Sequence, residues 1–204
     1  MANYSREATR VFPVSGIHFL ASLFFAGVTA ICAHISFRLW YTPVPVTLQV
    51  FAVILSGLTL GSRLGALSQI QYLMMGLLGM PVFSCGNFGM AAFAGPTGGY
   101  LIGFVVGAYV SGMVFEKLKS RSNASAVLAG CLGIVVIYLF GASWLAVWLA
   151  FFQGENIGGC ILGAWQLGVA PFIGIDFLKA VIASGVVLGG RFSKGSLSAF
   201  TKYR

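Results

Sequence analysis

Apolar residues fill this sequence in long runs that no charged residue interrupts. The uncharged segments cover residues 11–37, 39–62, 64–115, 122–154 and 156–175. A helix needs about 20 predominantly apolar residues to span a bilayer, so these runs are long enough for several spanning helices. A transmembrane β-barrel would instead alternate polar and apolar residues. The pattern therefore predicts an all-α membrane protein.

Glycine and proline residues divide the longest run, 64–115, which is too long for a single helix. With these breaks, the sequence predicts six transmembrane helices, at about 14–36, 45–61, 64–79, 97–117, 124–151 and 169–190. No low-complexity segment interrupts them. We therefore expect a single six-helix transmembrane domain that covers residues 1–204.

Composition supports the same class of protein. Hydrophobic residues make up 58% of the chain and charged residues only 8%, whereas an ordinary soluble domain is about 25% charged. So few charges cannot cover the surface of a water-soluble fold of this size. The composition therefore excludes a cytosolic enzyme, a disulfide-stapled secreted module and a disordered tail.

Lysine and arginine are distributed unequally between the two predicted sides of the membrane. The side with both termini holds ten of them: Arg6, Arg10, Arg63, Lys117, Lys119, Arg121, Arg191, Lys194, Lys202 and Arg204. The opposite side holds only Arg38. Because cytoplasmic loops carry the excess of positive charge, we expect a multi-pass protein of the cytoplasmic (inner) membrane with both termini in the cytoplasm. This topology explains the net charge of +8 without a nucleic-acid partner.

The outer side receives two glycine-rich segments without lysine or arginine, 80–96 and 152–168, which we expect to be loops. The first is apolar yet full of helix-breaking residues. Irregular backbone at membrane depth is tolerated only where it is buried in protein or lines a cavity. The sequence therefore predicts a re-entrant outer loop between the third and fourth helices, with a plain surface loop as the alternative.

Two charged residues interrupt the last predicted helix. Asp176 and Lys179 are three positions apart and share one helix face. Charges within a membrane are costly unless they are paired or face a cavity, and they commonly mark functional sites. The pair favours a ligand site, and the alternative is a salt bridge that only satisfies itself.

Three further polar residues lie at the same predicted membrane level as this pair, namely Gln49, Asn87 and Tyr100. Together the five residues describe a pocket for a small, partly apolar organic ligand. An enzyme is not expected, because no nucleophile–base pair, metal-ligand set or second acid accompanies Asp176. We also expect no cofactor and no metal. Cys85 and Cys160 both fall on the outer side, where a disulfide is topologically possible.

Small residues form two regular rows that predict helix packing. Gly95, Gly99, Gly103 and Gly107 recur at every fourth position, which lets a neighbouring helix approach closely. In the first helix, Ala26 and Ala30 belong to a similar row that could pack within the chain or receive another subunit.

Five segments, taken together and in order, resemble the BioY biotin transporters. They read PVPVTLQVFAV at 43–53, GSRLGALS at 61–68, GLLGMPVF at 76–83, GPTGGYLIGF at 95–104 and GVAPFIGIDFLKA at 168–180. The resemblance runs from the second predicted helix to the sixth. Segments 84–89 and 170–175 depart from the usual family pattern.

The resemblance implies a six-helix substrate-binding (S) component of an energy-coupling factor transporter, which captures biotin from outside. Such a component lies in the membrane lipid. It works with a transmembrane coupling protein and two ATPase subunits. The family's Asp and Lys match Asp176 and Lys179, and its pocket residues match Asn87, Gln49 and Tyr100. Its coupling-protein contact matches Ala26 and Ala30.

Biotin suits these residues chemically. Its ureido ring offers N–H donors to Asp176 and a carbonyl acceptor to Lys179, and an alternative places Lys179 on the carboxylate of biotin instead. Two alternative functions also stay open at this point. One is a solitary biotin carrier without a dedicated ATPase module, and the other is a carrier of a related small vitamin.

Overall fold

The computed structural model describes residues 16–118, 122–153 and 157–201. The long helices are α1 (Gly16–His34), α2 (Gln49–Leu60), α3 (Ser62–Leu77), α5 (Gly98–Lys117), α6 (Asn123–Gln153) and α8 (Ile173–Thr201). The shorter elements are η1 (Ser84–Gly86), α4 (Gly89–Ala94), α7 (Ile157–Gly168) and the antiparallel strands β1 (Ser36–Phe37) and β2 (Val46–Thr47). The chain is therefore helical almost throughout, as predicted.

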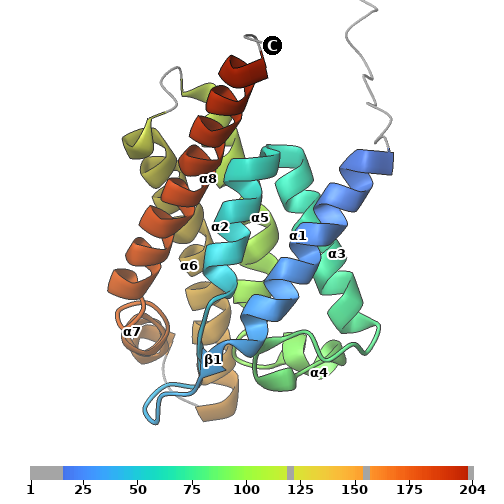
Figure 1. Cartoon of the computed structure of the whole chain (residues 1–204). Helices are drawn as coiled ribbons and strands as arrows, with labels where there is room; N and C mark the ends of the chain where they lie inside the picture. The colour runs from blue at the N-terminus through green and yellow to red at the C-terminus, as the bar shows by residue number, and fades with distance from the viewer. Residues whose placement is uncertain (1–15, 119–121, 154–156, 202–204) are drawn as a thin grey trace, which may run out of the picture.

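The long helices run lengthwise through the molecule, and the short elements gather at one end (Figure 1). The α2–α3 turn and the C-terminal end of α8 lie at the upper end of this view, and α1 begins there. The β1–β2 link, α4 and α7 lie at the lower end. The two outer segments expected from the sequence thus share one end of the bundle.

By length and hydropathy, three helices of the described chain can cross a membrane: α1, α5 and α6. Helices α7 and α8, bent by 49° at their junction, add a fourth span if they are counted as one. Helix α2 is apolar but has only 12 residues. The structure is that of an all-helical, multi-pass membrane protein, and the count of six spans stays a prediction.

The segment 152–168 differs from its expected state, because most of it forms α7 rather than a loop. Its side chains explain the difference. Cys160 and Ala164 are buried one helical turn apart, whereas Ile161, Leu162 and Trp165 are exposed. This spacing gives an amphipathic helix whose inner face packs on α6. Five glycines in the segment favoured a loop from the sequence, but tertiary packing outweighs their low helix propensity.

The glycine row packs α5 closely against α6, as predicted. A Cβ atom on Gly99 would collide with Trp144 and the carbonyl oxygen of Phe140, and one on Gly103 would lie 3.1 Å from the backbone of Ile137. Gly95 instead ends α4, so the row in contact with α6 begins at Gly99.

The alanine row of α1 faces the interior of the chain. Ala26 is 0% exposed and Ala30 is 8% exposed, in the core formed with the neighbouring helices. The exposed apolar residues of α1, such as Leu20, Phe24 and Ile31, lie on the other side of the helix. In the chain alone, Ala26 and Ala30 thus pack against neighbouring helices, and their contact with a coupling protein stays a prediction.

The segment 80–96 folds back against the helices. Val82, Phe83 and Ser84 are buried, and the Phe83 ring centroid lies 5.5 Å from that of Tyr72 in α3 and 5.7 Å from that of Phe93. The depth of this segment in the membrane stays a prediction. No disulfide joins Cys85 and Cys160.

The predicted orientation of the chain depends largely on lysine and arginine residues that lie outside the described ranges. Arg6, Arg10, Lys119, Arg121, Lys202 and Arg204 lie outside the described residues. The structure places Arg63 at the beginning of α3 and Lys117 at the end of α5. Arg38 follows β1 at the opposite end of the bundle. The cytoplasmic position of the termini therefore stays a prediction.

Candidate ligand-binding site

One cavity brings together all five residues singled out from the sequence. It is lined by Gln49 at the beginning of α2, Asn87 after η1, Tyr100 in α5, and Asp176 and Lys179 in α8. The empty space, including the opening at its mouth, is about 630 Å³. The cavity therefore gathers polar side chains from four separate segments of the chain around one space.

Asp176 and Lys179 form a buried ion pair on the first turns of α8. Lys179 Nζ lies 2.6 Å from Asp176 Oδ1 and also donates to the carbonyl oxygen of Thr47, at 2.7 Å. The two residues are only 3% and 7% exposed. Pairing and the bond to Thr47 offset the large desolvation cost of burying two charges. The pair therefore anchors α8 to β2 at the wall of the cavity.

This pair still has hydrogen-bonding capacity for a ligand. A lysine ammonium has three N–H donors, and a carboxylate has about four lone-pair sites. Lys179 uses donors on Asp176 and Thr47, and each oxygen of Asp176 accepts a hydrogen bond, Oδ1 from Lys179 and Oδ2 from Tyr138. A ligand that offers both an N–H donor and a carbonyl acceptor can therefore bind to the pair without breaking it.

Tyr138 of α6 is a site residue that the sequence reasoning missed. Its hydroxyl donates to Asp176 Oδ2 at 2.6 Å, so Asp176 lies between Tyr138 and Lys179. The two partners are 38 positions apart in the chain, and no spacing in α6 indicated which face would meet α8. The only available signal was a tyrosine in the middle of an otherwise apolar helix.

Tyr100 holds the junction between α7 and α8. Its hydroxyl donates to the carbonyl oxygen of Gly168 at 2.8 Å, and its ring lies where a Cβ atom on Gly141 would be. Because the hydroxyl is engaged by the backbone, the ring is the part that lines the cavity. Tyr100 therefore forms part of the cavity wall with its ring and holds the end of α7 with its hydroxyl.

Gln49 connects the cavity to the segment 80–96. Its side-chain Nε2 donates to the hydroxyl of Tyr72 at 2.6 Å, and that hydroxyl donates to the carbonyl oxygen of Val82 at 3.0 Å. This chain of bonds leaves the second N–H and the carbonyl oxygen of the Gln49 amide for other partners. Asn87 is exposed at the mouth of the cavity, and its backbone is bonded to Phe83 and Ser84.

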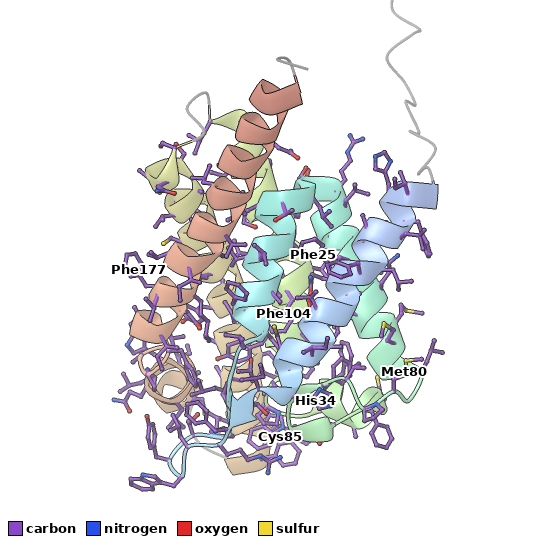
Figure 2. All side chains as sticks on the ribbon, in the orientation of Figure 1. Phe25, His34, Met80, Cys85, Phe104 and Phe177 are labelled. Carbon is purple, nitrogen blue, oxygen red and sulfur yellow. The ribbon has the colours of Figure 1, made fainter. Side chains whose placement is uncertain are left out.

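Much of the remaining wall is apolar. Phe104, which lies between the helices in Figure 2, lines the cavity together with Val50, Leu101, Ile137 and Phe172. Polar groups thus gather around the ion pair, and hydrophobic side chains surround the remaining space. This combination suits a ligand with one hydrogen-bonding ring and an apolar body. Fold and site together define a multi-pass membrane protein that binds a small organic molecule.

Comparison with known proteins identifies the family. The sequence profile of the BioY family matches residues 8–194, so the chain belongs to the BioY family. The chain is 42% identical to a probable biotin transporter BioY of Pyrococcus horikoshii over 167 residues, which are 82% of this chain and 90% of that protein. It is 38% identical to the biotin transporter BioY of Thermotoga maritima over 146 residues, which are 72% and 80% of the two chains.

A solved structure is similar to the whole fold. It is a crystal structure of the S-component for biotin from an ECF-type ABC transporter, with a TM-score of 0.72 and 26% sequence identity. The match covers 86% of this chain and 90% of that one. The family resemblance seen in the sequence is confirmed.

Proposed function

We propose that this chain binds biotin and takes it up across the membrane as the S component of an energy-coupling factor transporter. The observation that carries this proposal is the buried Asp176–Lys179 pair in a cavity shared with Gln49, Asn87 and Tyr100. The relatives named as biotin transporters and the biotin S-component of similar fold support it. The family is one of transporters, so the chain acts in transport rather than as an enzyme, and no cofactor is part of the proposal.

The proposed binding mode places the ureido ring of biotin against the ion pair. Asp176 accepts a hydrogen bond from a ring N–H, and Lys179 donates to the ring carbonyl. Because Lys179 Nζ and Asp176 Oδ1 are 2.6 Å apart, both groups reach the same end of the ligand. Gln49 and Asn87 offer amide groups nearby, and the apolar wall with Tyr100 surrounds the sulfur-containing ring and the stem.

The proposed topology follows from the distribution of charge and from the bundle. It has six spans in the cytoplasmic membrane, both termini in the cytoplasm, and the segment 80–96 as a re-entrant loop at the outer mouth of the cavity. A transmembrane coupling protein and two ATPase subunits are the proposed partners. The first helix with Ala26 and Ala30 is the proposed contact for the coupling protein, although both alanines are buried in the chain alone.

Uptake of labelled biotin tests this function. We expect a bacterium that lacks biotin synthesis and uptake to accumulate labelled biotin when it expresses this chain with the coupling protein and ATPase subunits. Excess unlabelled biotin should block accumulation, and excess thiamin or riboflavin should not. Equal competition by another vitamin would reassign the substrate, and the absence of uptake despite assembly of the complex would contradict the proposal.

A further inference from the structure

A second cavity adjoins the ligand-binding cavity at the end of the bundle where β1 and α4 lie. The two cavities share five lining residues: Pro45, Ser84, Asn87, Ala92 and Thr97. The second cavity is bounded by the link between β1 and β2 and by the segment 84–97. It is therefore continuous with the proposed biotin site and lies on the side away from the midpoint of the bundle.

Arg38 lines this second cavity, directly after β1. Its Nε–H donates to the sulfur of Cys85 at 3.4 Å, and the backbone N–H of Cys85 donates to Ser36 Oγ at 3.3 Å. Cys85, which is labelled in Figure 2, lies in this region at the lower end of the molecule. The bond through Nε orients the guanidinium and leaves its other N–H donors for a further partner.

The charges of the two cavities are distributed unevenly. Among the described residues that line them, the cations are Arg38 and Lys179. Lys179 is paired with Asp176. The described part of the chain has one other acid, Glu116, and this residue binds the backbone N–H and hydroxyl of Ser62. Arg38 therefore has no carboxylate partner within the described chain.

We propose that Arg38 binds the carboxylate of the substrate, so that the second cavity is an anion subsite of the biotin site. This proposal rests on the proposed function. When the ureido ring occupies Asp176 and Lys179, the valerate stem places the carboxylate at the other end of the ligand. The adjoining cavity, where Arg38 has no carboxylate partner among the described residues, receives it. A guanidinium matches a carboxylate in shape and forms strong charge-assisted hydrogen bonds.

The structure favours Arg38 over Lys179 for this role. For Lys179 to serve the carboxylate, it would have to leave Asp176 or the carbonyl oxygen of Thr47, both of which are within 2.7 Å. Removing Lys179 from Asp176 would strand a carboxylate that is 3% exposed, which is costly. Arg38 can accept an anion without giving up a buried partner.

Binding of biotin and of biotin amide to the purified full-length chain tests the subsite. The amide replaces the carboxylate with an uncharged group and keeps the ureido ring. We expect the wild-type protein to prefer biotin over the amide by about tenfold, the size of one exposed charge-assisted hydrogen bond. Arg38→Gln should remove most of this preference and leave the affinity for the amide unchanged, and Arg38→Lys should keep part of the preference.

The amide also serves as the control for folding, because an intact ureido site still binds it in Arg38→Gln. Lys117→Gln is the matched variant, since it removes one exposed positive charge at the opposite end of the bundle, and its preference should stay within about twofold of wild type. A wild-type protein that binds biotin and the amide equally would overturn the subsite. So would an Arg38→Gln protein with an undiminished preference, or a Lys117→Gln protein that loses as much preference as Arg38→Gln. Failure of the wild-type protein to bind either compound would instead contradict the proposed function.

Discussion

Asp176 is a carboxylate that the fold holds from two sides, by Tyr138 through Oδ2 and by Lys179 through Oδ1. A carboxylate fixed in this way presents its remaining lone pairs in one direction, so little side-chain freedom is lost when a ligand binds. The position of Asp176 at a cavity was predictable, because a charge in an apolar helix is costly unless it is paired or faces a cavity. The contribution of Tyr138 was not, because it depends on the rotation of α6 relative to α8.

Asp176→Asn should weaken biotin binding by about ten- to a hundredfold, because a hydrogen bond to a charged group contributes roughly 1.5–3 kcal/mol. The substitution keeps the shape of the side chain but leaves the Lys179 ammonium without its anion. Equilibrium binding of labelled biotin to the purified variant measures the effect. An affinity equal to that of the wild-type protein would mean that the pair is only a self-satisfied salt bridge.

Tyr138→Phe should have a smaller effect, about fivefold in affinity, because it removes one hydrogen bond to Asp176 and keeps the ring. The same binding assay applies. Tyr109→Phe provides the control, since Tyr109 is exposed on α5. If Tyr138→Phe and Tyr109→Phe bind biotin equally well, Tyr138 does not position Asp176.

The helices were more predictable from the sequence than their packing partners. Six predicted segments correspond to the six long helices, because uncharged apolar runs bounded by charges or breakers define them. A row of small residues predicts a close contact but does not say with which neighbour. The glycine row meets α6, and in the chain alone the alanine row of α1 packs against neighbouring helices.

Gly103→Val should disrupt the contact between α5 and α6, because its Cβ would already lie 3.1 Å from the backbone of Ile137. Backbone atoms cannot move aside as a flexible side chain can, so we expect a lower thermal unfolding temperature in detergent. Gly185→Ala in α8 is the control, since a Cβ there meets no atom within 4 Å. A Gly103→Val protein as stable as Gly185→Ala would show that the close approach is not needed.

At the scale of the whole molecule, the bundle has two chemically different ends. One end has the α2–α3 turn, where Glu116 of α5 binds the first residue of α3. The other has the cavities, the β1–β2 link and α4. The distribution of lysine and arginine predicts which end faces the cytoplasm. The structure agrees that the expected outer segments lie at one end of the bundle and the α2–α3 turn at the other (Figure 1).

Cysteine labelling tests this orientation. In a background without the native cysteines, Trp40→Cys on the β1–β2 link and Thr59→Cys near the α2–α3 turn both place a thiol at an exposed position. A membrane-impermeant maleimide added to intact cells should label Trp40→Cys only. Labelling of Thr59→Cys alone would invert the orientation, and labelling of both would contradict the separation of the two ends.

Saturation binding of labelled biotin to the purified chain in detergent tests most directly whether biotin binds at the Asp176–Lys179 pair. The comparison is between the wild-type protein and the double variant Asp176→Ala/Lys179→Ala. Because both charges are removed together, no unpaired charge stays buried, and the fold should persist. We predict saturable binding to the wild-type protein and a loss of at least a hundredfold in the folded double variant, or about 2.7 kcal/mol. Equal affinity of the two proteins would contradict the claim and place the biotin site elsewhere.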